Sequence, residues 1–268
     1  MKVAAIQMVS GTSVSSNLQR AAALLRQAAR EGAELAVLPE YFCLLGHKDT
    51  DKLAVQERLG EGDIQRFLSD TARELGLWLV GGTLPLSTDQ PGRVRNSTLV
   101  FSPRGERVAR YDKIHLFRFD NGRERHDESR VLEPGSEPVV FELDARSGQR
   151  WRVGLSVCYD LRFPELYRAL GADLLLVPSA FTEVTGRAHW EVLLRARAIE
   201  NLAWVLAPAQ GGLHENGRRT WGHSMLINPW GQVLAEQAEG EAVVSGELDA
   251  AEQARCRLQL PALEHRVL

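Results

Sequence analysis

The chain has 268 residues, of which 44% are apolar and 25% are charged, and its formal net charge is −3. This balance is ordinary for a globular protein and gives no reason to expect nucleic acid or a membrane surface as a partner. Three cysteines spread far apart argue against a disulfide framework and for a reducing compartment. The N-terminal segment lacks the apolar core of a signal peptide, and no apolar run approaches the roughly 20 residues of a membrane span. We therefore expect a cytoplasmic protein.

The first half of the chain alternates between strand-like and helix-like segments. Strands are predicted over 3–8, 35–38, 78–82, 96–101 and 108–111, and amphipathic helices over 17–31 and 64–75. The polar stretch around 87–94 is predicted to be a loop. A charge-rich segment over 118–135 has no clear period and is long for a plain connection, which is typical of functional or disordered loops.

The second half continues the alternation. Strands are predicted over 139–143, 151–157, 174–177, 204–207, 224–228, 232–235 and 242–247. Helices are predicted after Pro164, over about 188–201 and from near Asp249, with a loop over 178–186 and a turn over 229–231. No linker or repeat interrupts this pattern, which indicates a single α/β domain over residues 1–268. About a dozen strands are many for one open sheet, so we expect two packed sheets.

One stretch carries a candidate nucleophile. Residues 153–157 have the pattern of a buried strand, Cys158 follows it, and Pro164 suits the first turn of a helix. Backbone N–H groups and the positive end of a helix dipole would favour a thiolate at Cys158. Free cysteine is also one of the most buried residue types, so this stretch alone leaves a structural thiol as the alternative.

Glu40 and Lys113 share the placement of Cys158, because each follows an apolar strand. Ligand sites in open α/β sheets lie beyond the carboxyl ends of strands. A cysteine that attacks an amide or nitrile carbon needs a base for its proton and donors where the oxyanion develops. A carboxylate at Glu40 suits the base, and Lys113 with the Tyr159 backbone N–H suits the oxyanion. Taken singly, Glu40 and Lys113 are more typical of solvated surface charges than of catalytic residues.

The histidines do not compete well for the role of base. His115 lies two residues after Lys113 and would point the same way on an extended segment. His189 and His223 are more typical of hydrogen-bonded structural residues. No His/Cys/Asp cluster has metal-ligand spacing, and no Gly-rich loop is placed to hold phosphate. We therefore expect neither a metal nor another cofactor.

Three blocks of the sequence resemble the signature blocks of the nitrilase superfamily of carbon–nitrogen hydrolases. They are 38–40, 111–116 and 158–165, they occur in the family's order, and the resemblance covers nearly the whole chain. It implies an α/β fold of the four-layer α-β-β-α sandwich type that forms homodimers. It also implies a triad in which Glu40 is the general base, Lys113 stabilises the oxyanion and Cys158 is the nucleophile.

The same resemblance assigns further residues to the site. Glu128 is expected to help position the substrate and the lysine, with a surface carboxylate in a charged loop as the alternative. Arg162 and Glu165 are expected to pair beneath the site. Phe181 and Thr182, with Tyr159, are expected to contact the substrate.

Later blocks resemble the deaminated glutathione amidase branch of this superfamily, and the ω-amidase branch shares part of them. They are 178–181, 185–186, 188–200, 209–212, 222–225 and 229–231. This implies hydrolysis of a small carboxylate-bearing amide, with deaminated glutathione giving 2-oxoglutarate and cysteinylglycine through a thioester. The alternatives are an ω-amidase on 2-oxo-acid amides, an N-carbamoyl amino acid hydrolase, and a catalytically silent binding protein of the same fold.

The segment 118–125 departs from both branches because it is rich in arginine, at Arg118, Arg123 and Arg125. Arg125 either holds a substrate carboxylate through a bidentate contact or is a solvated loop charge. Cys43 lies close to Glu40 in the sequence and is interpreted as a structural thiol.

Overall fold

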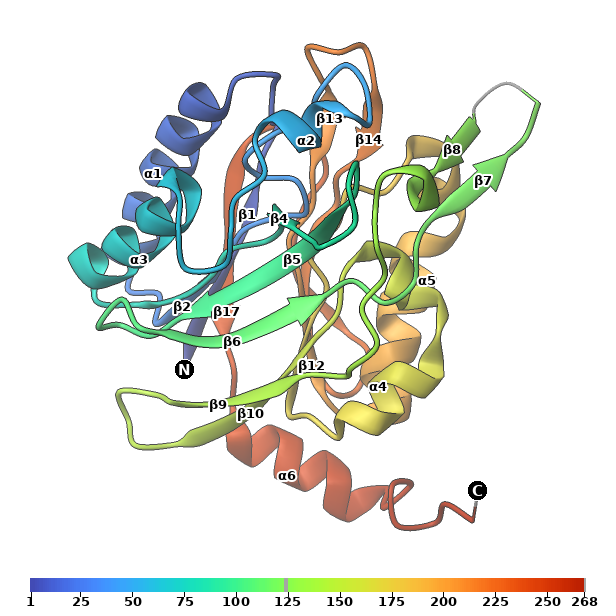
Figure 1. Ribbon diagram of the computed structural model, residues 1–268. Helices are drawn as coiled ribbons and strands as arrows, with labels where there is room; N and C mark the ends of the chain where they lie inside the picture. Colours follow the sequence, from blue (N-terminus) through green and yellow to red (C-terminus); the bar gives the residue numbers. More distant parts are fainter. Residues whose placement is uncertain (123–124, 268) are drawn as a thin grey trace.

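The computed structural model describes residues 1–122 and 125–267, and its two large sheets pack face to face (Figure 1). The first sheet has the order β17-β1-β2-β3-β5-β4, with β6 paired to β5, and the second has the order β16-β15-β12-β11-β10-β9. The strands of the first sheet are β1 (Lys2–Gln7), β2 (Leu35–Val37), β3 (Trp78–Val80), β4 (Leu84–Ser87), β5 (Val94–Phe101), β6 (Arg107–Asp112) and β17 (Ala242–Glu247). Those of the second are β9 (Val140–Asp144), β10 (Arg150–Leu155), β11 (Leu174–Leu176), β12 (Trp204–Ala207), β15 (Ser224–Ile227) and β16 (Val233–Gln237).

Helices cover the outer face of each sheet. The first sheet carries α1 (Val14–Arg30) and α3 (Asp63–Leu75), and the second carries α4 (Pro164–Leu170) and α5 (Glu183–Asn201) (Figure 1). The short helix α2 (Asp51–Ala54) lies against β4, and α6 (Ala250–Gln259) follows β17. This arrangement confirms the four-layer α-β-β-α sandwich.

Strand β1 shows how the sequence builds two cores from one strand. Val3 and Ala5 pack into the core between the sheets, whereas Ala4 and Ile6 pack against α1 residues such as Leu25. Successive side chains of a strand point to opposite faces, so a strand covered on both sides must be apolar throughout. The continuous apolar runs in the sequence therefore mark strands in the middle layers.

Two helix starts differ from the predicted bounds, and both differences have a capping side chain as their cause. Helix α1 begins at Val14, ahead of the predicted residue 17, because the Ser13 hydroxyl accepts a hydrogen bond from the Ser16 N–H. Helix α5 begins inside the loop predicted over 178–186, because the Thr182 hydroxyl accepts from the Thr185 N–H.

Outside the two large sheets, the structure also contains two short hairpins that the sequence did not indicate. The charge-rich segment forms β7 (Arg118–Asp120) and β8 (Arg125–Asp127), followed by a 3₁₀ turn at Glu128–Arg130. A second hairpin joins β13 (Gly211–Leu213) and β14 (Arg219–Trp221). Strands of three residues are too short to show a reliable period of two.

The parallel strands of the two sheets end on the same side of the molecule. Strands β1, β2 and β3 run parallel, as do β10, β11 and β12. The strand ends of the two sheets meet in a bridge between Met8 and Gln210. Glu40 follows β2, Lys113 follows β6 and Cys158 follows β10, so the fold brings the three segments to one edge. None of the helices in the described ranges is long and apolar enough to cross a membrane.

Candidate active site

Lys113 lies at the centre of a buried ionic cluster. Its Nζ donates to Glu40 Oε1 at 2.9 Å, and it lies 3.0 and 2.9 Å from the two carboxylate oxygens of Glu128. The side chains of Lys113 and Glu40 are 0% and 1% exposed. Burial lowers the pKa of an ammonium group, but the carboxylates of Glu128 and Glu40 outweigh this effect and hold the pKa of Lys113 well above its usual value. Lys113 is therefore a permanent cation in the site.

Neutral hydrogen-bond donors fix the orientation of the Glu40 carboxylate. Asn96, on β5, donates from its side-chain amide to Glu40 Oε1 at 2.9 Å. The backbone N–H of Ala180, in the loop after β11, donates to Oε2 at 2.9 Å. Each oxygen of this buried carboxylate thus has a donor from a different segment, which removes its freedom to rotate.

Glu128 belongs to the same cluster and is only 15% exposed, so it is not a solvated carboxylate of a charged loop. The Tyr41 hydroxyl donates to one of its oxygens at 2.8 Å, and the Phe117 N–H donates to the other at 2.7 Å. Burial opposes ionisation of Glu128, but the Lys113 ammonium and these donors outweigh burial and hold the pKa of the Glu128 carboxyl below its usual value. Glu128 is therefore an anion that fixes the position of Lys113.

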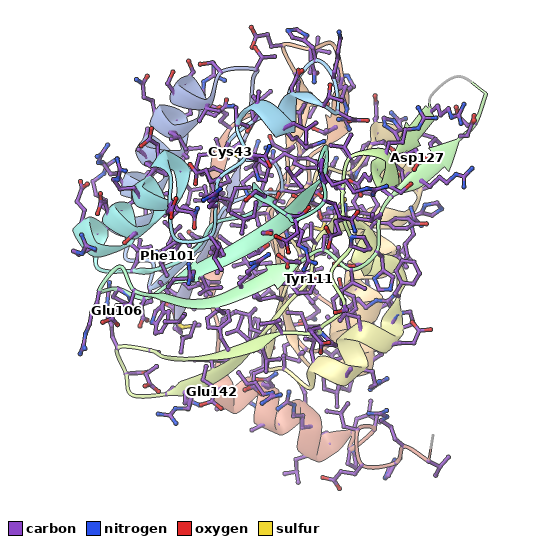
Figure 2. All side chains as sticks on the ribbon, in the orientation of Figure 1. Cys43, Phe101, Glu106, Tyr111, Asp127 and Glu142 are labelled. Atoms are coloured by element: carbon purple, nitrogen blue, oxygen red, sulfur yellow. The ribbon has the colours of Figure 1, made fainter. Side chains whose placement is uncertain are left out.

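Cys158 occupies a strained position at the start of a 3₁₀ helix, Cys158–Arg162. Its φ of 50° is in the left-handed region, which is uncommon for a residue other than glycine. The Cys158 N–H donates to the Pro178 carbonyl at 3.0 Å. The buried Asp160 carboxylate accepts from the Val157 N–H at 2.8 Å and from the Tyr111 hydroxyl at 2.6 Å. Tyr111, labelled near the end of β6 in Figure 2, is fully buried, so its hydrogen bond to Asp160 links this strand to the cysteine turn.

The prediction that Cys158 is a stabilised thiolate is wrong for this structure. Burial and the Glu40 carboxylate raise the pKa of the Cys158 thiol well above its usual value, and Lys113 and the Ala180 N–H only partly oppose them. The start of the short 3₁₀ helix does not overcome these effects. Cys158 therefore rests as a thiol, and its proton must be removed as the sulfur reacts.

Replacing Glu40 by glutamine is expected to lower the pH at which Cys158 becomes reactive toward iodoacetamide by about 1 unit or more. Of the charges that raise the pKa of Cys158, Glu40 contributes most, and the substitution removes it while Lys113 remains. The measurement is the alkylation rate of the Cys158 peptide, followed by mass spectrometry between about pH 6 and pH 10, a range that brackets the usual thiol pKa. Cys256, on the remote helix α6, is the internal reference. A profile that stays in place or moves to higher pH would contradict this electrostatic account.

A pocket opens above the cluster. It is lined by Glu40, Tyr41, Phe117, Glu128, Cys158, Tyr159, Arg162, Ala180, Phe181, Thr182, Thr185 and Arg218. Three of the predicted substrate contacts, Tyr159, Phe181 and Thr182, therefore line the same pocket as the candidate nucleophile. Arg125 does not, because it lines an adjoining groove and lies 3.9 Å from Asp120. Arg123 lies outside the described residues.

Arg162 has a different place from the one expected. It lines the pocket instead of pairing with Glu165 beneath the site. Its guanidinium lies 5.7 Å from the ring centres of both Tyr159 and Phe181, and its Nη2 is 3.2 Å from His189 Nδ1. The aromatic rings hold the guanidinium at the pocket wall.

The histidines take structural positions. His115 does not follow Lys113 into the site, because its ring contacts Asp160 Oδ1 at 2.7 Å and stacks on Phe163 at a centroid distance of 3.7 Å. His223 pairs with Glu236. Within residues 1–122 and 125–267, no group of three or more His, Cys, Asp or Glu side chains is arranged to hold a metal ion.

Sequence reasoning missed several residues of the site. Tyr41, Asn96 and the Ala180 N–H orient the two carboxylates, and Arg218 lines the pocket from the β13–β14 turn. Asn96 carried a usable signal, since an amide at the start of a strand-like run needs a buried partner. The others carried none, because their role depends on segments far away in the sequence.

The carbon–nitrogen hydrolase family model matches residues 2–257. The chain belongs to this family. It is 40% identical to a deaminated glutathione amidase of Synechocystis sp., over 98% of this chain and 97% of that one. It is 37% identical to the omega-amidase NIT2 of Homo sapiens, over 99% and 94% of the two chains. The crystal structure of Saccharomyces cerevisiae Nit3, a member of branch 10 of the nitrilase superfamily, superposes with a TM-score of 0.88 at 30% identity, over 100% of this chain and 97% of that one.

Proposed function

We propose that this carbon–nitrogen hydrolase is a cysteine-dependent amidase whose substrate is deaminated glutathione, and that residues 1–268 form one catalytic domain. The observation that carries the proposal is that Glu40 and Glu128 line one pocket with Cys158, and that both carboxylates contact the buried ammonium of Lys113 directly behind the pocket wall. Full-length similarity to proteins named deaminated glutathione amidase supports the choice of substrate. The products are 2-oxoglutarate and cysteinylglycine.

The first half-reaction forms a thioester. Glu40 accepts the Sγ proton as the sulfur attacks the amide carbon, and the carbonyl electron pair moves onto the oxygen. Lys113 has three N–H donors and shares its ammonium between two carboxylates, so one N–H is left for this oxyanion. The Tyr159 N–H is the second donor, because the first N–H groups of a helix lack partners within it. The C–N bond then breaks, and Glu40 returns the proton to the departing nitrogen.

The second half-reaction releases the acid. A water molecule gives a proton to Glu40 as its oxygen attacks the thioester carbon, and the same donors hold the new oxyanion. Collapse breaks the C–S bond, and the Cys158 sulfur takes the proton back from Glu40. The raised pKa of the Cys158 thiol suits a cycle that begins and ends with the neutral sulfur.

Charge on the pocket wall supports an anionic substrate. Lys113 is matched by two carboxylates, whereas Arg162 and Arg218 line the pocket as additional cations. A guanidinium binds a carboxylate through two parallel hydrogen bonds. We propose that Arg162 binds the 2-oxo-acid half, because it lies beside Tyr159 in the chain segment that carries Cys158.

The test is the release of 2-oxoglutarate from deaminated glutathione and, separately, from 2-oxoglutaramate. We expect kcat/KM to be at least about 10-fold higher for the first, which corresponds to one additional charged hydrogen bond. Preference for the second would move the protein to the ω-amidase function, which the 37% identity to human omega-amidase supports as the second candidate. Folded protein that releases 2-oxoglutarate from neither would overturn both assignments.

We also propose that the enzyme forms a homodimer. Helix α5 exposes apolar side chains at Val184, Val192 and Ile199, which are 50%, 68% and 47% exposed, and the nearby Trp230 is 51% exposed. Exposed apolar patches of this kind favour association. Sedimentation velocity of the wild-type protein and of Val192→Glu tests the homodimer. A wild-type protein that is monomeric at micromolar concentration would contradict the proposal. The cytoplasmic location stays a prediction.

A further inference from the structure

We propose, on the basis of the amidase function above, that Arg218 binds a carboxylate on the leaving group of the substrate. The enzyme would then select amides whose departing amine is a short peptide-like acid. This contact lies on the opposite side of the scissile bond from the acyl half that Arg162 binds. No residue of the proposed chemical mechanism performs this role.

Arg218 stands where two hollows of the surface join. It lines the pocket that contains Cys158, and it also lines an adjoining open groove. Thr182, at the start of α5, is the other residue common to both, and Arg125 and His126 of the β7–β8 hairpin also line the groove. A substrate that reacts at Cys158 and is too long for the pocket therefore continues between Thr182 and Arg218 into the groove.

Arg218 differs from its neighbours in its electrostatic partners. Arg219 forms ion pairs with Glu183 and Glu239, and Arg125 lies near Asp120. The guanidinium of Arg218 has no carboxylate within ion-pair distance among residues 1–122 and 125–267. It is half-buried, so its charge is screened less than that of a fully exposed arginine. Within the part of the chain that the structure describes, Arg218 is therefore a cation without a carboxylate partner, at the point where the pocket meets the groove.

The backbone that carries Arg218 is held in place. The Arg218 N–H donates to the side chain of Asn216 at 2.9 Å, and the Arg218 carbonyl accepts from the His214 N–H at 2.8 Å. Asn216 also donates to the carbonyls of Leu45 and Gly46, which ties the turn to the segment after Glu40. Because the turn is already ordered, binding of a carboxylate by Arg218 costs no backbone conformational entropy there.

The length of the leaving group limits how far its carboxylate lies from the scissile bond. Two residues of extended chain span at most about 7 Å, so the carboxylate of a dipeptide amine lies within one or two residue lengths of the scissile nitrogen. Because Arg218 lines the same pocket as Cys158, we expect this carboxylate to contact Arg218 while the amide carbon stays at the sulfur. Ammonia, the leaving group of a simple ω-amide, reaches nothing there. The contact would therefore separate peptide-like amides from simple ones.

The experiment compares three substrates, which are deaminated glutathione, its C-terminal amide and 2-oxoglutaramate. With the wild-type enzyme, we expect kcat/KM for deaminated glutathione to exceed that for its C-terminal amide by about 10- to 100-fold, as one charged hydrogen-bond pair would give. In Arg218→Gln this ratio is expected to fall to about 1 to 3, within the variation of one uncharged contact. We expect this ratio to fall because kcat/KM for deaminated glutathione decreases, and not because kcat/KM for its C-terminal amide increases.

The matched control is Arg187→Gln, which removes the same charge from α5. Arg187 pairs with Glu183 and lies over Trp221, and it lines neither hollow. It is expected to keep the wild-type ratio. A wild-type ratio near 1, an Arg218→Gln ratio equal to that of the wild type, or an equal loss in both arginine variants would overturn the proposal.

A binding measurement distinguishes two negative results, one in which the Arg218 contact is wrong and one in which the proposed function is wrong. Titration calorimetry with Cys158→Ala measures the dissociation constants of deaminated glutathione and its C-terminal amide without turnover. If the wild-type enzyme hydrolyses none of the three substrates, the proposed function is wrong. The Arg218 contact is then supported only if the acid binds about 10-fold more tightly than the amide and Arg218→Gln removes this difference. Equal binding or no binding overturns it.

Discussion

Replacing Cys158 by alanine is expected to lower kcat for amide hydrolysis by at least about 10⁴-fold, while the protein stays folded. The proposed reaction passes through a covalent bond to the sulfur, and no other cysteine lines the pocket. The substitution removes one buried atom and leaves the ionic cluster of Lys113 with Glu40 and Glu128 complete. The measurement is the rate of 2-oxoglutarate release, together with the thermal unfolding curve.

The matched control is the same cysteine-to-alanine substitution at a position outside the pocket. Cys256→Ala removes a thiol from α6, far from the pocket, and is expected to leave the rate within about 2-fold of the wild type. Residual hydrolysis above about 1% in Cys158→Ala would mean that water is activated without a covalent intermediate. Such a result would also remove the thioester from the mechanism.

Replacing Lys113 by methionine is expected to impair both stability and activity. Methionine fills a similar volume but leaves the buried Glu40 and Glu128 carboxylates without their cation. Breaking a buried pair from one side typically costs about 3–5 kcal/mol in the free energy of unfolding. Loss of an oxyanion donor is expected to lower kcat by about 10²- to 10³-fold. Chemical denaturation and the 2-oxoglutarate assay measure the two effects.

The stability deficit of Lys113→Met is expected to depend on pH in one direction. In the wild-type protein the pKa of Glu128 is depressed, so its contribution to stability is present above the unfolded value of about 4.3 and is lost as the pH falls through the folded value. The variant lacks the charge that depresses this pKa. The gap in unfolding free energy between the two proteins should therefore narrow below about pH 4.3. A gap that widens there would contradict the ion-pair explanation.

A second substitution separates the two consequences of losing Lys113. Glu128→Gln in the Lys113→Met background removes one of the two unpaired carboxylates while keeping a side chain of similar shape. Part of the lost stability should return, whereas hydrolysis should not, because the oxyanion donor is still missing. Lys113→Met protein as stable as the wild type would show that solvent or a shifted side chain neutralises the cluster.

The amino-acid sequence by itself determined the layers of this protein and the segments that carry its chemistry. Continuous apolar runs such as 3–6 mark strands that need cover on both faces, and helical spacing such as that in 64–75 marks the covering layers. Glu40 and Cys158 were recognisable because each follows such a run, whereas the strand before Lys113, β6, is largely polar and only partly buried. These signals are local, since burial on a strand or helix face is encoded by the period of the chain.

Only the tertiary structure decided how these segments act on one another. The partners of Glu40 and Glu128 come from β5, from the turn after β2 and from the loop after β11, and their approach depends on the order of strands in two sheets. The local sequence around Cys158 favoured a thiolate, but burial and the Glu40 carboxylate raise the pKa of the thiol. Arg218 reaches the pocket through a hairpin of three-residue strands. Electrostatic energies depend on distance and on exposure to water, and both are fixed by contacts between segments distant in the sequence, which no local period encodes.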